Sequence, residues 1–219
     1  TAAHWQERPA YFLNIGFTWG GLQALAVSDG TLQNFPAAFR EGPSDATRAA
    51  HVGDTDASAP ANWVLGNPAT PVDLVLSLYA DGHRRDVFEQ KTKLLRQLFA
   101  AGGLNELSYH DATALPEGKV HFGYRDGIAQ PSIALTGDTG PPDMQPASGP
   151  GEFLLGKDYV NQYAGNFIGD LPAALCDNAT FAALRMLKQD VRAFENLIRQ
   201  AGKLHNMKPG LVAAKMMGR

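Results

Sequence analysis

Two stretches of the chain alternate apolar and polar residues or are rich in aromatic and branched apolar residues, and such patterns predict β-strands. The first spans residues 11–17 (YFLNIGF), and the second spans residues 72–79 (VDLVLSLY). We predict two further strands over residues 104–112 and 119–122. All four fall within the first 125 residues, so a single sheet is expected there.

Apolar residues recur at helical spacing in other segments. Residues 83–101 should form a long amphipathic helix, whose buried stripe would comprise Val87, Leu94, Leu95, Leu98 and Phe99. Residues 179–201 carry the strongest helical pattern, with Asn178 as the expected cap. Shorter helices are expected over residues 20–27 (capped by Thr18), near residues 36–40, and over residues 210–217.

The order of these elements indicates an α+β fold with a ferredoxin-like antiparallel sheet and helices on one face. We place an amino-terminal domain over residues 1–130, a proline- and glycine-rich connector over 131–150, and a second ordered unit over 151–219. Residues 30–70 and 157–178 read mainly as loops. Three aromatic residues in the first loop are expected to pack as core residues: Phe35, Phe39 and Trp63.

Composition narrows the class of protein without identifying it. The chain has 219 residues, of which 44% are hydrophobic and 19% charged, and its formal net charge is −3. This is ordinary soluble composition, with no basic footprint for nucleic acid or an anionic membrane. No apolar run is long enough to cross a bilayer, and no signal-peptide pattern is visible, so we expect a cytoplasmic protein. Cys176 is the only cysteine, which rules out an internal disulfide.

Several common catalytic patterns are missing. The six histidines form no His-x-x-x-His pair, so zinc catalysis is poorly supported. There is no Gly-x-Ser-x-Gly elbow of a hydrolase and no Gly-x-Gly-x-x-Gly dinucleotide loop. The stretch that remains is VHFGYRDGIAQP, residues 120–131.

This stretch should form a tight loop that presents one carboxylate. Gly123 and Gly127 permit backbone angles that side chains forbid, and Pro131 stiffens the chain that follows. Asp126 lies between the two glycines, and a fixed carboxylate beside an open glycine suits a proton-transfer residue. Asp-Gly is also a common turn dipeptide, so a purely structural turn is the alternative.

The segment HFGYRDGI resembles the Gly-x-x-Asp-Gly signature of the dye-decolourising peroxidases, which are haem enzymes. Residues 35–42 and the segment GEFLLG (151–156) are also similar to that family. The resemblance implies two similar ferredoxin-like halves, with residues 151–219 as the beginning of the second. It also implies heme b as the cofactor, hydrogen peroxide as one substrate, and a dye or other organic electron donor as the other.

The same resemblance implies roles for individual residues. Asp126 would be the distal acid–base residue, and it would lie against the haem together with Gly127, Ile128, Ala129 and Gln130. Arg125 is expected to be structural, because neighbours on an extended chain point to opposite faces. His121 is expected to be a structural histidine at a strand end.

The family's proximal histidine and distal arginine have no counterpart here. Residues 213–219 (AAKMMGR) resemble the family text just before that region, and His205 is not expected to bind iron. We therefore expect this chain to be an amino-terminal portion, with no metal ligand of its own and with the carboxy-terminal half as a missing partner. The alternative is a non-catalytic α+β binding module, or an inactive fragment that needs a partner chain. Homo-oligomerisation stays open.

Overall fold

The structure is a computed structural model that describes residues 7, 9–125, 133, 148–156 and 170–216. Its internal contacts divide the chain into two units, each described here by itself. The first unit comprises residues 1–111 and 131–182, and the second comprises residues 112–130 and 183–219. The domain boundaries expected from the sequence stay a prediction.

A two-stranded antiparallel sheet forms the centre of the first unit. Strand β1 (Tyr11–Phe17) pairs with β2 (Leu74–Ala80), with Leu13 opposite Leu78. Both strands confirm the sequence prediction, with β2 starting two residues later than expected. Because side chains alternate along a strand, Leu13 and Leu78 share one apolar face of the sheet.

The turn after β1 is determined by one threonine and one glycine. The Thr18 hydroxyl caps helix α1 (Trp19–Ala24) by accepting the N–H of Gly21 at 3.1 Å, and it donates to the Val72 carbonyl at 2.7 Å. Thr18 N–H donates to the Asp73 carbonyl at 3.1 Å. These bonds tie the start of α1 to the segment that enters β2, and they confirm Thr18 as the cap.

Residues 29–62 contain more helix than the sequence predicted. The short elements are α2 (Asp29–Leu32), α3 (Ala37–Glu41), α4 (Ala46–His51) and two 3₁₀ turns, Asp56–Ser58 and Pro60–Asn62. Side-chain caps explain two of them, because Ser28 caps α2 and Asp45 caps α4. Helix α3 agrees with the short helix expected near residues 36–40, whereas the other elements are too short to show apolar periodicity and were not predicted.

The core of the first unit gathers around these short helices. Leu22, Leu32 and Phe35 are buried, and Phe39 and Phe181 pack against them. The rings of Phe35 and Phe39 lie 4.8 Å apart between centroids at an interplanar angle of 33°. The core prediction for these two aromatics is confirmed.

Trp63, the third expected core aromatic, lies outside that cluster. Its side chain is half-buried, and its indole N–H donates to the Ser58 carbonyl at 2.8 Å.

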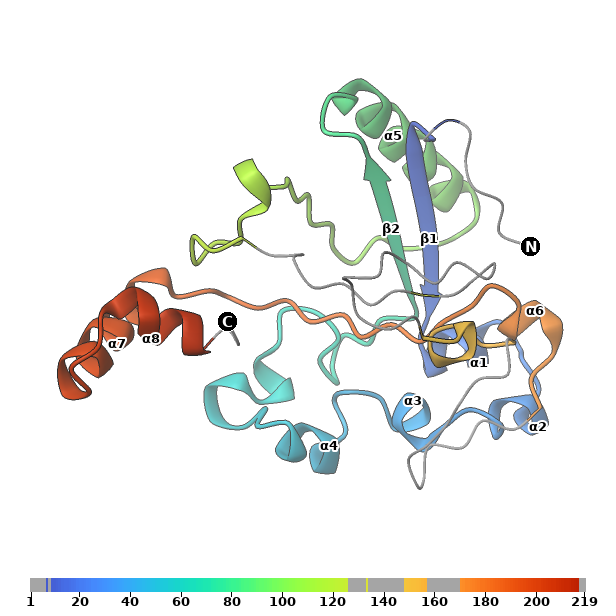
Figure 1. Ribbon diagram of the computed structural model, residues 1–219. Coiled ribbons are helices and arrows are strands. Elements are labelled where there is room, and N and C mark those ends of the chain that lie inside the picture. The colour runs from blue at the N-terminus through green and yellow to red at the C-terminus, as the bar shows by residue number, and fades with distance from the viewer. Residues whose placement is uncertain (1–6, 8, 126–132, 134–147, 157–169, 217–219) are drawn as a thin grey trace. The chain divides into compact units, whose positions relative to one another are not determined.

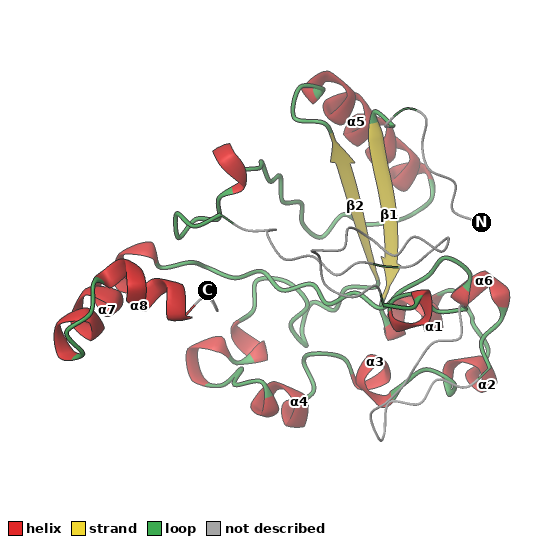
Figure 2. Ribbon diagram, viewed as in Figure 1, coloured by secondary structure: helices red, strands yellow, loops and turns green. Residues whose placement is uncertain are grey.

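Helix α5 (Arg85–Ala101) confirms the predicted long helix, although it begins two residues later than expected, and it contacts β2 (Figure 2). Its predicted stripe is only partly buried. Val87 is buried, whereas Leu94 is 45% exposed and Leu98 is 58% exposed. Among the described residues the sheet has two strands, and it covers only part of this helix.

The strands predicted over residues 104–112 and 119–122 are wrong. Residues 104–112 run without regular structure, and residues 119–125 form a tight turn instead. A strand needs a neighbour for its backbone hydrogen bonds, and residues 104–112 pair with no strand among those described. Local apolar pattern cannot reveal whether such a neighbour is present.

The helix predicted over residues 179–201 begins twelve residues later, as α7 (Val191–Leu204). Two contacts hold the preceding segment in the first unit: the Thr180 hydroxyl donates to the Phe153 carbonyl at 2.6 Å, and Phe181 packs on Phe39. The cap is Asp190, whose carboxylate accepts the Ala193 N–H at 2.8 Å. Asn178 has φ of 58°, which is not a cap geometry.

Helix α8 (Pro209–Met216) agrees with the short helix expected over 210–217. It packs against α7 around Ile198, Val212 and Ala213, all of which are buried. One further helix, α6 (Ala173–Cys176), and two 3₁₀ turns, Pro116–Gly118 and Pro150–Glu152, complete the described elements (Figure 1). Within the described ranges, no helix is both long and apolar enough to cross a membrane.

Candidate active site

Residues 119–125, just before Asp126 in the sequence, form a small β-hairpin. The Val120 N–H donates to the Tyr124 carbonyl at 2.9 Å, and the Gly123 N–H donates to the Val120 carbonyl at 2.8 Å. Lys119 and Arg125 form an antiparallel bridge next to these bonds. The chain therefore reverses direction over three loop residues, His121 to Gly123.

Gly123 makes this reversal feasible. Its φ is +86°, in the left-handed region where a glycine pays no steric penalty. A three-residue hairpin loop commonly consists of a turn followed by a residue in this region, usually glycine. The first glycine of the signature, Gly123, thus permits the turn, as predicted for a tight loop. The strand predicted over residues 119–122 is instead one arm and part of the loop of this hairpin.

The two aromatic residues of the hairpin both contact helix α7. Phe122 lies with its ring centroid 4.6 Å from that of Phe194, at an interplanar angle of 35°. Tyr124 meets the same ring edge-on, at 6.2 Å and 82°. Tyr124 also packs against the buried cluster of α7 and α8. The hairpin is therefore attached to the helical pair from one side.

The predicted site residues themselves, Asp126, Gly127, Ile128, Ala129 and Gln130, lie outside the described residues. The hairpin ends at Arg125, which is exposed and whose described role is the backbone bridge to Lys119. His121 is exposed in the turn itself, rather than at a strand end as expected.

The five described histidines have similar surroundings. His51, His83, His110, His121 and His205 are all exposed. His205 follows α7, and its backbone N–H donates to the Ala201 carbonyl at 3.0 Å. Among the residues that the structure describes, no group of three or more His, Cys, Asp or Glu side chains could hold a metal ion.

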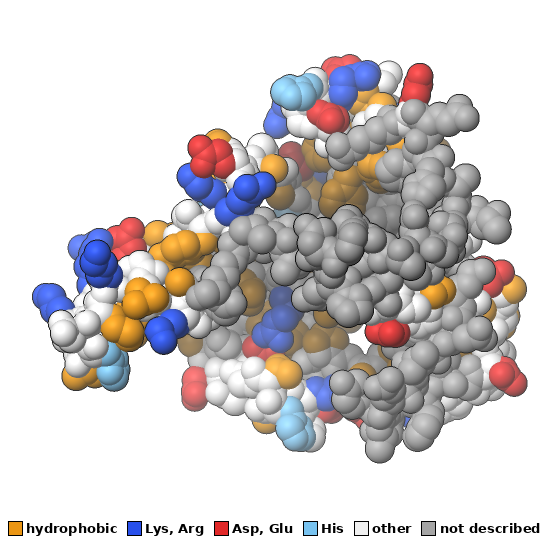
Figure 3. Space-filling view, in the orientation of Figure 1, with side chains coloured by type: hydrophobic (Ala, Val, Ile, Leu, Met, Phe, Trp, Pro, Cys, Tyr) orange, Lys and Arg blue, Asp and Glu red, His pale blue; other side chains and the backbone are white. Residues whose placement is uncertain are grey.

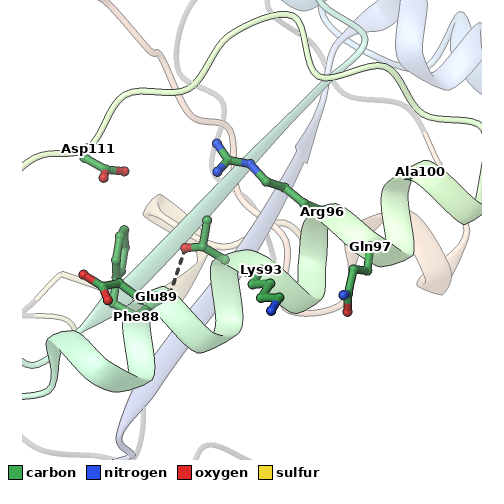
Figure 4. A pocket seen from close by; sticks show the side chains of 8 residues that line it. Phe88, Glu89, Lys93, Arg96, Gln97, Ala100 and Asp111 are labelled. Atoms are coloured by element: carbon green, nitrogen blue, oxygen red, sulfur yellow. Dashed lines mark hydrogen bonds between the residues drawn. The ribbon is translucent and has the colours of Figure 1, made fainter.

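One shallow pocket of about 530 Å³ lies along α5, in the first unit (Figure 4). Its walls combine charged and apolar side chains, and they include Phe88, Lys93, Arg96 and Asp111. Sequence reasoning did not find it, because it depends on how residues 104–111 return past the helix. Nothing in its lining resembles a set of convergent catalytic groups.

Arg96 holds that returning segment. Its guanidinium donates to both carboxylate oxygens of Glu106, at 2.8 and 2.7 Å, and lies over the Tyr109 ring at 4.5 Å. The paired hydrogen bonds from Arg96 lower the pKa of the Glu106 carboxyl, and the same contact raises the pKa of Arg96. Two-point pairing of this kind fixes orientation as well as charge.

Apolar side chains also reach the surface of the second unit, over α7 and α8 (Figure 3). Leu204 is 79% exposed, and Leu197 and Leu211 are exposed as well.

The chain is similar in sequence to known peroxidases. No family model matches the chain. The chain is 28% identical over 222 residues to a dye-decolourising peroxidase of Mycena epipterygia and 27% identical over 221 residues to one of Exidia glandulosa. These alignments cover 97% of this chain but only 38% and 40% of the two relatives.

Solved structures agree with these sequence matches. A dye-decolourising peroxidase from Auricularia auricula-judae superposes with a TM-score of 0.56 and 25% sequence identity, over 71% of this chain and 33% of that protein. The likeness confirms the predicted α+β class with a ferredoxin-like arrangement. The chain spans about two fifths of the length of its curated relatives. Over nearly its whole length the chain is thus similar to dye-decolourising peroxidases, in agreement with the resemblance seen in its sequence.

Proposed function

We propose that this chain is the amino-terminal part of a haem peroxidase that reduces hydrogen peroxide and oxidises dyes or other organic donors. The observation that carries the proposal is the hairpin 119–125, which holds the first half of the family signature against α7 and ends directly before Asp126. The similarity to dye-decolourising peroxidases over 97% of the chain supports the same function.

In this proposal Asp126 is the distal acid–base residue. Its carboxylate takes the proton from the near oxygen of hydrogen peroxide and returns it to the far oxygen, which leaves as water. Gly127, Ile128, Ala129 and Gln130 would contribute to holding the haem. A bound heme b group would supply the redox chemistry, by which electrons pass from the donor to the peroxide.

The iron ligand is assigned to a part of the protein outside this chain. Haem iron needs an axial donor such as histidine, and the described histidines are exposed. We therefore give this chain only the proton-transfer side of the site. The carboxy-terminal half would complete it, either in the same chain or as a separate one, and the exposed leucines of α7 and α8 are compatible with such a neighbour. We likewise propose, from the sequence, a cytoplasmic location.

The alternative function, a non-catalytic binding module, also predicts a partner surface. Haem binding separates the two. Haemin should be added both to this chain and to a version extended to the length of the relatives, and the Soret band recorded. The peroxidase proposal expects a histidine-ligated spectrum and peroxide turnover only in the extended protein.

Two results would contradict the proposal. An extended protein that binds no haem would favour the binding module. Well-ordered haem in this chain alone, lost in His205→Ala, would show that His205 serves as the ligand and that the assignment of the iron bond is wrong. His83→Ala is the matched control, because His83 is also exposed but lies in the first unit.

A further inference from the structure

We propose that residues 182–189, which link the two units, are a coil-to-helix switch that can lengthen helix α7 at its amino end. In the structure they belong to a coil that leads from residue 179 to Asp190 and then into α7 (Figure 1). The boundary between the two units falls in this link, since Ala182 is the last residue of the first unit and Ala183 opens the following part of the second. The inference does not depend on the proposed function.

The composition of the link favours a helix. Residues 182–189 read AALRMLKQ, and every residue type in this stretch is among the strongest helix formers. The stretch contains no glycine, proline or β-branched residue, and no short polar residue that would compete for backbone hydrogen bonds. Its coil conformation is therefore imposed by contacts at its ends and not by its own residues.

The leucines of the link continue the packed stripe of α7. Ile198 is buried in the cluster that joins α7 to α8, and Phe194 packs against it. Counted back from Ile198 in alternating steps of four and three, the same helical face passes through Phe194, Val191, Leu187 and Leu184. In the coil, Leu184 is 60% exposed and Leu187 is 73% exposed. A longer α7 would bring both leucines into line with a stripe that already packs.

Contacts at both ends of the link hold the coil. At one end, Phe181 packs in the core of the first unit. At the other end, the Asp190 carboxylate accepts the Ala193 N–H at 2.8 Å and so caps α7 at its present start. Arg185 and Lys188 also oppose the helix, because cations near a helix amino terminus interact unfavourably with its dipole. Removal of either end contact should therefore favour the longer helix.

The switch changes how far the link can reach. Ten residues span up to about 33–36 Å when fully extended but only about 15 Å as an α-helix. Phe181 anchors one end of the link in the first core, and Val191 begins α7 at the other. The state of the link thus sets the largest separation that these two anchors can have, which couples the packing of Phe181 to the length of α7.

The test removes one end contact at a time from the 219-residue chain and measures amide hydrogen exchange. Asp190→Ala removes the cap and supplies a strong helix former, and Phe181→Ala releases the other end. A helix that begins near residue 182 pairs the N–H groups from about residue 187 onward, because its first four N–H groups have no intrahelical acceptor. Loss of the cap and the better propensity of alanine together favour this helix by about tenfold. We expect the amides of residues 187–192 to exchange about threefold or more slowly than in the unaltered chain.

Two further variants are the controls. Asp45 caps α4 in the same way, with its carboxylate 3.0 Å from the Arg48 N–H, but it follows the helix-breaking residues 42–44 (GPS). Asp45→Ala should therefore create no protected amides ahead of α4. Lys188→Pro, combined with Asp190→Ala, should abolish the new protection, because proline interrupts a helix interior and is tolerated in a coil. Slow exchange within α5 shows that the first unit stays folded in each variant.

The proposal is overturned if residues 187–192 exchange as fast in both Asp190→Ala and Phe181→Ala as in the unaltered chain, or if their protection survives Lys188→Pro. Faster exchange at Phe194 in Asp190→Ala, with no protection upstream, would show that the cap only prevents fraying of α7 and that the link has no helical state.

Discussion

The backbone of Gly21 lies so close to that of Asp73 that a Cβ atom added to Gly21 would be 1.9 Å from the Asp73 carbonyl oxygen. The approach occurs where α1 begins beside the segment that enters β2. It joins the segment that precedes the short helices of residues 29–62 to the segment that follows them. The glycine is therefore required by packing and not by an unusual backbone angle.

Replacing Gly21 with Ala should destabilise the protein by about 1–3 kcal/mol or more, because the backbone carbonyl cannot move aside as a flexible side chain could. The measurement is the free energy of unfolding in urea. Gly30→Ala is the matched control: Gly30 is also helical, no atom lies within 4 Å of its added Cβ, and a gain of about 0.4–1 kcal/mol is expected. Equal effects for the two substitutions would show that the close approach is not real.

Gly123 provides a second test, of backbone angle rather than space. Its φ is +86°, and no atom lies within 4 Å of an added Cβ. Gly123→Ala should therefore cost about 1–2 kcal/mol through backbone strain alone, and Gly123→Asn should cost less because asparagine tolerates this region. Amide exchange at Val120 should follow the same order. If Ala and Asn were both neutral, the hairpin turn would have another conformation.

The ion pair between Arg96 and Glu106 predicts a pH dependence. Because Arg96 lowers the pKa of Glu106 in the folded state, the contribution of the pair is fully present above the ordinary glutamate pKa of about 4.3 and is lost as the pH falls through the lowered value. Glu106→Gln should thus lower the melting temperature at pH 7 and have no such effect at strongly acidic pH.

The control for this prediction is Glu89→Gln, which removes a more exposed pair with Arg85. Its effect at pH 7 should be smaller, since both partners are better solvated. A Glu106→Gln effect that persists unchanged into strong acid would mean that packing, not charge, holds residues 104–111 to α5.

Much of the fold was predictable where the signal is local. The range of α5 and the strand β1 follow from periodicity over seven or more residues, and Thr18 follows from capping chemistry. The errors occur where a segment depends on distant partners. Residues 104–112 have strand-like composition but pair with no described strand, and Phe181 is drawn into the first core by Phe35 and Phe39, which shortens the expected helix.

The candidate site was predictable only as a motif. The glycines of the signature indicate a tight loop, and the left-handed φ of Gly123 agrees with that interpretation. The contact of Phe122 with Phe194 could not be derived, because nothing in an isolated sequence links residues so far apart. The roles of Asp126, Gly127, Ile128, Ala129 and Gln130 stay predictions, since these residues lie outside the described part of the chain.

The reaction of the haem-loaded Asp126→Asn variant with hydrogen peroxide, followed by stopped flow, tests the central claim most directly. The substitution keeps the shape of the side chain and removes the base, and Asp111→Asn in the first unit is the control for the same chemical change. Steady-state dye turnover is unsuitable, because electron transfer from the donor can limit it. If Asp126 transfers the proton, the reaction should slow by about 10²–10⁴-fold with haem binding retained, whereas a fall of well under about tenfold would contradict the account and reduce Asp126 to a turn residue.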